Sequence, residues 1–186
     1  DKGMRTALNL QDKWTKYRHN IEFDQFLDLD PKKPSAWVQF KTKVFTINRE
    51  IREGKWPYDA FCMDSLTNFG IAALANVLHM SQRDKPQLQD WGTAIEDMRN
   101  ILRLITSWPV LVLVATHEQP FTDENDNIRA YKPKTLGVKL CDEVVCMFDE
   151  VWLTKTKKKP ATQGHADLIV SWLPQPMHET RTRSGS

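Results

Sequence analysis

The chain has 186 residues, of which 40% are hydrophobic and 27% charged, and its formal net charge is +2. This length and composition fit one globular domain and exclude a disordered chain, while the small net charge excludes a general attraction to nucleic acid outside local basic patches. No apolar run reaches the roughly 18 residues that span a membrane, so we expect a single domain over residues 1–186, in the cytoplasm and without a membrane partner.

The first half of the chain predicts helices that alternate with short strands. Residues 4–10 (MRTALNL) form either a strand or a connection, and the alternating apolar residues of 21–29 favour a short strand. Apolar residues at helical spacing predict amphipathic helices over 34–53 and 66–81. Between these helices, the short apolar run 59–63 (DAFCM) predicts a buried strand.

The second half predicts a third helix, a central strand and a group of closing strands. Residues 89–107 show the strongest amphipathic pattern, and Pro109 ends that helix. The continuous apolar run VLVLVA at 110–115 is typical of a strand buried on both faces of a parallel sheet. Residues 118–134 are polar and predict an exposed loop, which precedes a short helix over 136–148. The closing strands, two of them joined by a lysine-rich turn, are 149–156, 166–173 and 178–183.

Helices that separate buried strands are typical of proteins with a parallel sheet, and hairpin-like strands at the end of the chain add antiparallel pairs. We therefore expect an α/β fold. Its central sheet would be mostly parallel, with antiparallel strands at the C-terminal edge and helices on both faces.

The three cysteines, Cys62, Cys141 and Cys146, are odd in number and lie in apolar settings. This predicts reduced, buried thiols, as in cytosolic proteins. The five histidines are scattered without the spacing of metal ligands, so we expect no structural zinc site.

Asp64 follows the predicted strand 59–63 directly, within the segment YDAFCMDSLT. An acid at the tip of a buried strand is costly to hold there unless it meets a cation or stays hydrated. This is the form of a Walker B site, in which an Asp holds a Mg²⁺ ion carried by nucleotide phosphates. The alternative is that Asp64 or Ser65 caps the helix that follows.

His117 follows the second predicted central strand, which ends in Thr116-His117-Glu118. In open α/β sheets, ligands bind beyond the carboxyl ends of the parallel strands. If the two strands are neighbours, Asp64 and His117 face the same crevice. The alternative is a solvated histidine at the entrance of a loop.

The order of these segments resembles that of the RecA-like ATPases, and most closely the phage-encoded nucleotide-binding and single-strand-annealing recombination ATPases. The matching segments span residues 58 to 185 and are, in order, YDAFCMDSLT, the helix 89–107, VLVLVATHEQ, PKTLGVKL, DEVWLTK and HETRTRSG. The resemblance implies a RecA-like sheet, ATP and Mg²⁺ as cofactors, single-stranded DNA as a partner, and self-association into a ring or filament. It also implies a role in phage DNA recombination or replication, in the cytoplasm of the bacterial host.

The resemblance assigns roles to residues by their position in these segments. Asp64 would be the Walker B acid on Mg²⁺, with Ser65 assisting through a water molecule. Thr116 would contact the nucleotide, and His117 would be the polar sensor of the γ-phosphate. Asp1 resembles the acid that polarises the attacking water.

Arg181 and Arg183 are two residues apart, so in a strand they share a face. Two guanidinium groups on one face suit phosphate oxygens, although such charges also protect an edge strand from pairing with another chain. The resemblance matches them to the paired basic residues that reach into the nucleotide of a neighbouring subunit. Such residues raise rates by about 10³–10⁵.

The resemblance also places residues 118–140 where RecA-like proteins have mobile loops that touch single-stranded DNA. Lys132, Lys134 and Lys139 are the candidate phosphate contacts in this segment. The acidic residues of 123–126 (DEND) would instead repel a DNA backbone.

The chain departs from the family in the phosphate-binding loop. None of its seven glycines begins the pattern G-x-x-x-x-G-K-[ST], and Gly54-Lys55 is followed by Trp56. The backbone amides and the lysine of that loop cradle the phosphates, so we expect weak or no nucleotide affinity from this chain alone. The chain is either a fragment of a longer ATPase or a degenerate relative that serves as a scaffold. The fragment fits better, because loss of the first strand would expose the centre of the sheet.

Two other functions stay open. The chain could be a non-catalytic DNA-binding or assembly subunit of the same fold, which would use residues 118–140 and the basic turn 155–159. It could also be a packaging or helicase-type motor domain. Against the motor, Asp64 is followed by Ser65 and not by the glutamate that many such motors use.

Overall fold

The computed structural model describes residues 20–30, 32–157, 167–171 and 181–182. These residues form a mixed α/β structure, in which helices pack against a short parallel strand pair and antiparallel pairs follow along the chain. The first predicted element, residues 4–10, lies outside the described residues. No helix among them combines the length and the apolar character that crossing a membrane requires.

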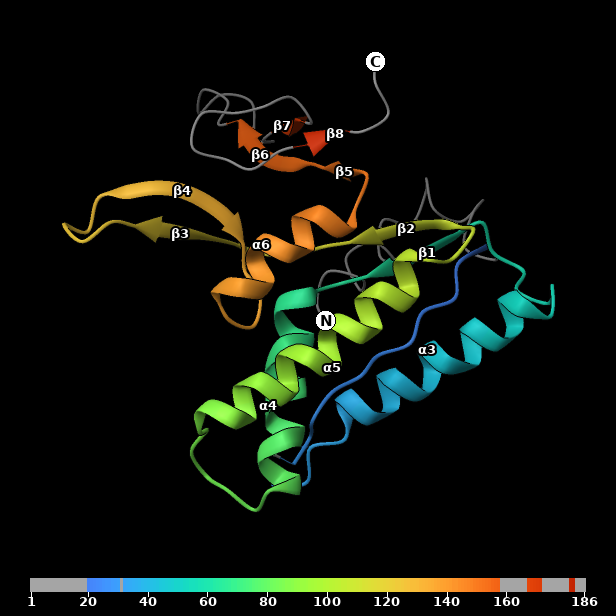
Figure 1. Ribbon diagram of the computed structural model, residues 1–186. Helices are drawn as coiled ribbons and strands as arrows, with labels where there is room; N and C mark the ends of the chain where they lie inside the picture. Colours follow the sequence, from blue (N-terminus) through green and yellow to red (C-terminus); the bar gives the residue numbers. More distant parts are fainter. Residues whose placement is uncertain (1–19, 31, 158–166, 172–180, 183–186) are drawn as a thin grey trace.

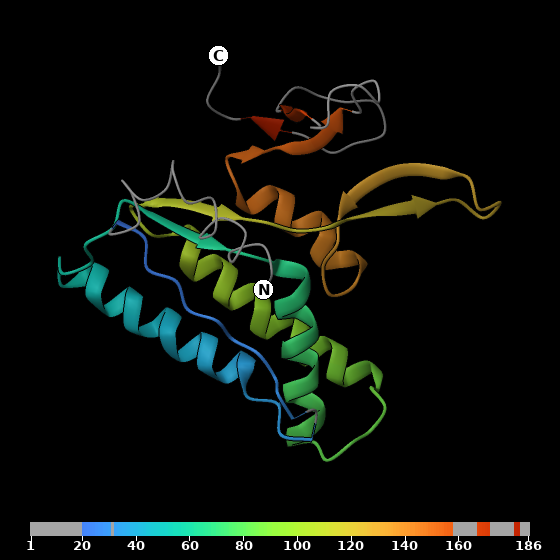
Figure 2. The same cartoon turned by 180° about the vertical axis from the view of Figure 1, so that it is seen from behind.

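Three helices lie on one side of the parallel strand pair. The helices are α3 (Ala36–Arg52), α4 (Leu66–Met80) and α5 (Leu88–Thr106), and the pair consists of β1 (Ala60–Met63) and β2 (Leu111–Val114). In both ribbon views the three helices lie below the two strands (Figures 1 and 2). The predicted positions and types of these five elements are confirmed, because each has a strong apolar period or an uninterrupted apolar run. The prediction that the strand 59–63 is buried is wrong, since only Met63 of β1 is buried.

Carboxylates stabilise the first turns of α3 and α5. Asp28 Oδ1 accepts hydrogen bonds from the backbone amides of Ser35 and Ala36, at 2.6 and 2.8 Å. Asp90 Oδ2 accepts one from the backbone amide of Gln87, at 2.9 Å. The first turn of a helix has free backbone amides and a partial positive charge. A nearby carboxylate accepts hydrogen bonds from these amides and interacts favourably with that charge.

The predicted strand over 21–29 is wrong, because this segment pairs with no strand in the described part of the chain. It is extended and runs alongside α3 (Figure 1). Lys43 Nζ lies 2.9 Å from Asp24 Oδ2, and the ring of Phe26 packs edge-on against that of Phe40 at 5.7 Å. Phe26 is the residue of this segment that packs against the core, whereas Ile21, Phe23, Leu27 and Leu29 are exposed, so burial does not follow the alternating pattern.

One hydrophobic core fills the space between the helices and the strand pair. Its fully buried members come from all of the helices that follow residue 35. They include Trp37, Phe40, Val44 and Ile47 of α3, Leu66 and Ala73 of α4, and Ala94, Met98, Ile101, Leu102 and Ile105 of α5.

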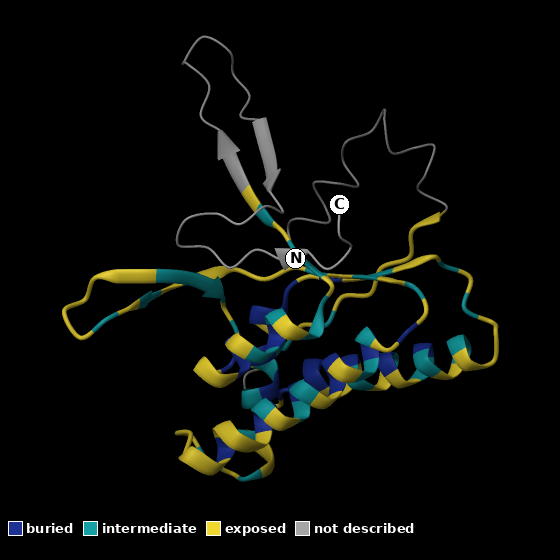
Figure 3. Ribbon diagram, turned by 45° about the horizontal axis from the view of Figure 1, so that its top comes forward, coloured by how far each residue is buried: buried dark blue, intermediate teal, exposed yellow. Residues whose placement is uncertain are grey.

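The strand pair buries only one of its two faces. Met63 is buried and Val112 packs against the core, whereas Leu111 and Leu113 are 59% and 40% exposed. Side chains alternate between the faces of a strand, and the described helices cover one face only (Figure 3). The predictions that VLVLVA is buried on both faces and that helices cover both faces are therefore wrong for the described residues.

The prediction of three buried thiols is wrong for two of them. Cys62 and Cys146 are exposed, and only Cys141 is buried. Cys62 belongs to the uncovered face of β1, which explains its exposure. Cys141 lies in the core, where its sulfur accepts a hydrogen bond from Gln119 Nε2 at 3.0 Å.

Residues 118–134 form a β-hairpin, so the predicted exposed loop is wrong. Strand β3 (Glu118–Thr122) pairs antiparallel with β4 (Ile128–Pro133), and the arm extends away from the helices (Figure 1). Its turn is held by Asp123, whose Oδ1 accepts hydrogen bonds from the amides of Asn125 and Asn127, each at 2.9 Å. The polar run DENDN thus forms a tight turn between strands.

A short helix and two antiparallel strand pairs follow the hairpin. In chain order, these elements are α6 (Val138–Met147), β5 (Glu150–Val151), β6 (Leu153–Lys157), β7 (Asp167–Ser171) and β8 (Arg181–Thr182). Strands β6 and β7 form the predicted antiparallel pair, while β5 pairs with β8. The predicted strand 149–156 is therefore split at Trp152. The described strands form four separate pairs, and not one continuous sheet.

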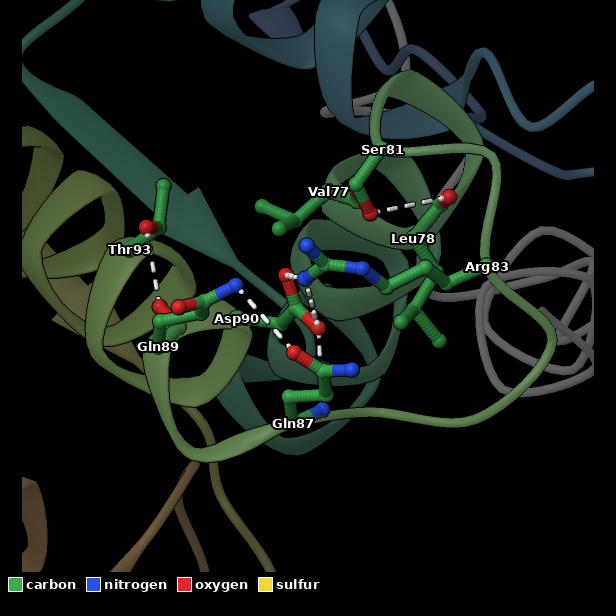
Figure 4. Close-up of polar contacts among 8 residues, drawn as sticks. All are labelled: Val77, Leu78, Ser81, Arg83, Gln87, Gln89, Asp90 and Thr93. Atoms are coloured by element: carbon green, nitrogen blue, oxygen red, sulfur yellow. Dashed lines mark hydrogen bonds and ion pairs between the residues drawn. The ribbon is translucent and has the colours of Figure 1, made fainter.

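An ion pair closes the connection between α4 and α5 (Figure 4). Arg83 donates to both carboxylate oxygens of Asp90, at 2.7 and 2.9 Å, and Asp90 is only 3% exposed. The amide of Gln87, and after it the Arg83 guanidinium, hold the pKa of Asp90 below its ordinary value of 3.8, against the opposing effect of burial. Asp90 therefore stabilises both the start of α5, through the amide of Gln87, and the loop before it, through Arg83.

We expect acid to remove the stabilising contribution of Asp90. Its pKa is lower in the folded chain than in the unfolded chain. Its contribution to the free energy of unfolding is therefore complete above about pH 4 and is lost as the pH falls through the folded pKa. The variant Asp90→Asn should be less stable than the wild type at neutral pH, with a difference that shrinks in acid. Urea denaturation at both pH values measures this, with the exposed Asp84→Asn as control. A difference independent of pH would contradict it.

Candidate functional site

The parallel pairing of β1 and β2 brings two predicted site segments to one edge. Cys62 pairs with Leu113 and Met63 with Val114, so the two strands end together. Asp64 follows β1 directly, and Thr116-His117 follows β2 after one residue. Asp64 and His117 were expected at one edge if their strands are neighbours, and the two strands are neighbours.

Ser65 is the cap of helix α4. Ser65 is 4% exposed, and its Oγ accepts a hydrogen bond from the backbone amide of Asn68 at 3.4 Å. Asp64, in contrast, is exposed, and its carboxylate makes no hydrogen bond or ion pair with the described residues. The peptide bond between Asp64 and Ser65 is cis. Of the two residues that could cap the helix, Ser65 does so and Asp64 is left with a hydrated carboxylate.

Thr67 links the start of α4 to the base of the hairpin. Its Oγ1 donates to the backbone carbonyl of Lys134 at 2.9 Å and accepts from the backbone amide of His117 at 3.2 Å. The hydroxyl of Thr116 lies 3.2 Å from that of Thr67 and 3.0 Å from the same Lys134 carbonyl. Thr67 stands within the segment YDAFCMDSLT, but its partners lie 50 and 67 residues away, so sequence reasoning did not find it.

His117 contributes its backbone to this network and its side chain to the solvent. The carbonyl of His117 accepts a hydrogen bond from the Lys134 amide at 2.6 Å, which closes the hairpin at its base. The residue is exposed, and the imidazole makes no hydrogen bond within the described part of the chain. Its ring is therefore accessible to a ligand at the edge it shares with Asp64.

The three candidate lysines differ in their surroundings. Lys132 forms an ion pair with Asp142, and its ammonium lies 4.8 Å from the centre of the Phe121 ring. Lys134, at the end of the hairpin, and Lys139, in the first turn of α6, are exposed. Two of the three are thus accessible to a phosphate. Lys134 comes immediately after β4 at the hairpin base, and Lys139 also lines the hollow between α5 and α6.

A hollow of about 630 Å³ lies between α5 and α6 and contains none of the predicted nucleotide residues. It is lined by the charged residues Glu96, Arg99, Arg103, Lys139, Asp142 and Glu143, beside Cys146 and Met147. Arg99 donates to both carboxylate oxygens of Glu143 and lowers the pKa of that carboxyl. Cations and acids are equal in number here, and Arg99 pairs with both Glu96 and Glu143. Such a set joins two helices more readily than it attracts a charged ligand.

The remaining predicted residues are not placed together by the structure. Asp1 and Arg183 lie outside the described residues. Arg181 belongs to β8 and pairs with Val151 of β5. The pairing of two guanidinium groups on one face stays a prediction.

Asp64 fits a magnesium ion carried by a nucleotide, and does not fit a metal site made by protein alone. The described residues contain no group of three or more His, Cys, Asp or Glu that could hold a metal. Mg²⁺ in nucleotide sites is bound through one or two carboxylates, with the phosphates and water as its other ligands. One exposed carboxylate at a strand tip meets that smaller requirement.

Comparison of the chain with models of known protein families finds no match. Comparisons with curated proteins and with solved structures also find none.

The division of roles between Asp64 and Ser65 can be tested by stability. We expect Ser65→Ala to lower the free energy of unfolding by about 1 kcal/mol, because α4 loses its cap. Asp64→Ala should leave the free energy of unfolding almost unchanged, because its carboxylate has no partner in the described structure. Urea denaturation followed by circular dichroism compares the two. Equal losses in both variants would show that Asp64 shares the capping role.

Proposed function

We propose that the chain supplies the Mg²⁺-binding part of a RecA-like ATPase site, in an enzyme that acts on single-stranded DNA in phage recombination or replication. The observation that carries this proposal is the Asp64 carboxylate. It is exposed at the carboxyl edge of the parallel pair, it has no partner among the described residues, and Ser65 relieves it of the capping role.

The neighbouring groups support this assignment. A carboxylate at a strand tip can bind Mg²⁺ on the phosphates of ATP, and the bound ion would neutralise charge that develops during phosphoryl transfer. The His117 imidazole follows the neighbouring strand and stands free in solvent, where it can donate a hydrogen bond to a terminal phosphate. The Thr116 hydroxyl points instead into the hairpin base in this structure.

The site as it stands lacks a phosphate cradle. The 186 residues contain no G-x-x-x-x-G-K-[ST] pattern, so the backbone amides and lysine of such a loop have to come from outside them. In the proposed enzyme, subunits assemble into a ring or filament, and Arg181 and Arg183 act on the nucleotide of a neighbour. These two roles rest on the resemblance alone.

A second candidate function is a DNA-binding or assembly subunit that hydrolyses nothing. It is favoured by the missing phosphate loop and by two exposed lysines, Lys134 at the hairpin base and Lys139 in the first turn of α6. The acidic turn around Asp123 would keep DNA away from the tip of the arm, so contact is expected near its base.

Replacing Asp64 tests the enzymatic proposal. In the protein that contains this chain, Asp64→Asn should reduce Mg²⁺-dependent ATP hydrolysis to background while the circular dichroism spectrum stays unchanged. The matched control is Asp84→Asn, which removes an exposed acid from the loop after α4 and should hydrolyse at the wild-type rate. ATP hydrolysis by Asp64→Asn at the wild-type rate would overturn the assignment of Asp64 as the Mg²⁺-binding acid. Absence of hydrolysis from the wild-type protein would favour the second candidate.

Replacing the exposed lysines tests the DNA partner. The double variant Lys134→Ala, Lys139→Ala should bind single-stranded DNA more weakly. Its slope of log affinity against log salt should be smaller by about 0.7 for each phosphate that the protein no longer neutralises. The matched control, Lys32→Ala with Lys33→Ala, removes two exposed lysines before α3 and should keep the wild-type slope. Fluorescence anisotropy of a labelled oligonucleotide at several salt concentrations measures both, and an unchanged slope in the first variant would exclude these lysines.

A further inference from the structure

We infer that Thr67 is a positioning residue that holds the base of the β3–β4 hairpin to the strand tip at Asp64, and through which a ligand at Asp64 changes the hairpin. The first half of this inference depends only on the geometry. The second half rests on the proposed function, because it needs a nucleotide at Asp64.

A single hydroxyl connects both ends of the hairpin to helix α4. His117, whose amide donates to Thr67 Oγ1, comes immediately before β3, and Lys134, whose carbonyl accepts from it, comes immediately after β4. Thr67 is only 8% exposed, so its hydroxyl has to be satisfied by protein groups. The hydroxyl of Thr67 therefore uses its one donor and one of its two acceptor positions at the hairpin base.

Thr67 differs from every other threonine in the described helices. Thr42, Thr46, Thr93 and Thr106 each donate to the carbonyl of their own helix four residues earlier, at 2.9 to 3.0 Å. For Thr67 that carbonyl belongs to Met63, and it already accepts the backbone amide of Ala115 at 2.9 Å. The usual local bond is thus replaced by contacts that lie far along the chain.

The path from Asp64 to this hydroxyl spans three residues and is fixed by hydrogen bonds to α4 and to Ala115, directly after β2. Ser65 caps α4, and the amide of Leu66 donates to the carbonyl of Ala115 at 2.8 Å. Thr67 is the next residue, so a displacement of the strand tip moves its hydroxyl relative to β2 and the hairpin. A coupling of this kind typically changes affinity between two sites by about 5–150-fold.

Hydrogen exchange without nucleotide tests the geometric half. Thr67→Val removes the hydroxyl and keeps the shape of the side chain, and Thr67→Ser keeps the hydroxyl. We expect the amide of His117 to exchange at least about tenfold faster in Thr67→Val, since its acceptor is removed, and at the wild-type rate in Thr67→Ser. The amide of Lys134 should also exchange faster in Thr67→Val, because its acceptor, the His117 carbonyl, is no longer held at the hairpin base. The control Thr42→Val loses a bond within its own helix and should leave both amides unchanged. Unchanged exchange in Thr67→Val would overturn the inference.

The effect of Mg²⁺–ATP on the affinity for a single-stranded oligonucleotide tests the second half. In the wild-type protein and in Thr67→Ser, Mg²⁺–ATP should change this affinity by several-fold. In Thr67→Val the ratio of the oligonucleotide affinity with Mg²⁺–ATP to the affinity without it should fall to about one, while each ligand alone binds as in the wild type. If Thr67 had a purely structural role, the affinities for both separate ligands would fall together. If Mg²⁺–ATP changes the oligonucleotide affinity of Thr67→Val as much as that of the wild type, the coupling is overturned and the proposed function still stands.

Wild-type protein provides the measurement that does not depend on the folding of a variant. Mg²⁺–ATP should change the exchange of the His117 and Lys134 amides together. Binding of Mg²⁺–ATP without any change at these two amides would overturn the coupling. No binding of Mg²⁺–ATP by the full protein that contains this chain would overturn the proposed function and the coupling, while the exchange in Thr67→Val would still decide whether the hydroxyl holds the hairpin.

Discussion

The parallel pairing of β1 with β2 above a one-sided core is the constraint on which the candidate site depends. Parallel strands end at the same edge, so the residues after Met63 and after Val114 meet there. Helix α4 begins at this edge, and the burial of α3, α4 and α5 against one face of the pair keeps it in place. The candidate site therefore derives its geometry from the core.

At that edge, backbone and side-chain roles are divided among consecutive residues. Ser65 satisfies the free amides of α4, Thr67 satisfies the base of the hairpin, and Asp64 is left exposed. A carboxylate that contributes nothing to packing or capping is available for chemistry. The hollow between α5 and α6 shows the opposite arrangement, because Arg99 and Glu143 satisfy each other there.

Prediction from the sequence succeeded where one local period dominates. The helices and the strands 59–63 and 110–115 follow from apolar spacing alone. The alternation in 21–29 was misassigned: this segment is extended but pairs with no described strand, and most of its apolar residues are exposed. The hairpin at 118–134 was missed because its turn is polar and because its strands contain Pro120 and Pro133, which are unfavourable in strands. Of the site, Asp64 and His117 were identified, and Thr67 was not.

By itself the sequence determined the order and type of most elements, the acid at the tip of β1 and the absence of a phosphate-binding loop. These depend on neighbouring residues, which a linear pattern records. Only the tertiary structure decided that the two strands are parallel neighbours, that Leu111 and Leu113 on one of their faces are exposed, and that Ser65 caps the helix instead of Asp64. Each of these depends on contacts between distant parts of the chain, such as the 67 residues that separate Thr67 from Lys134.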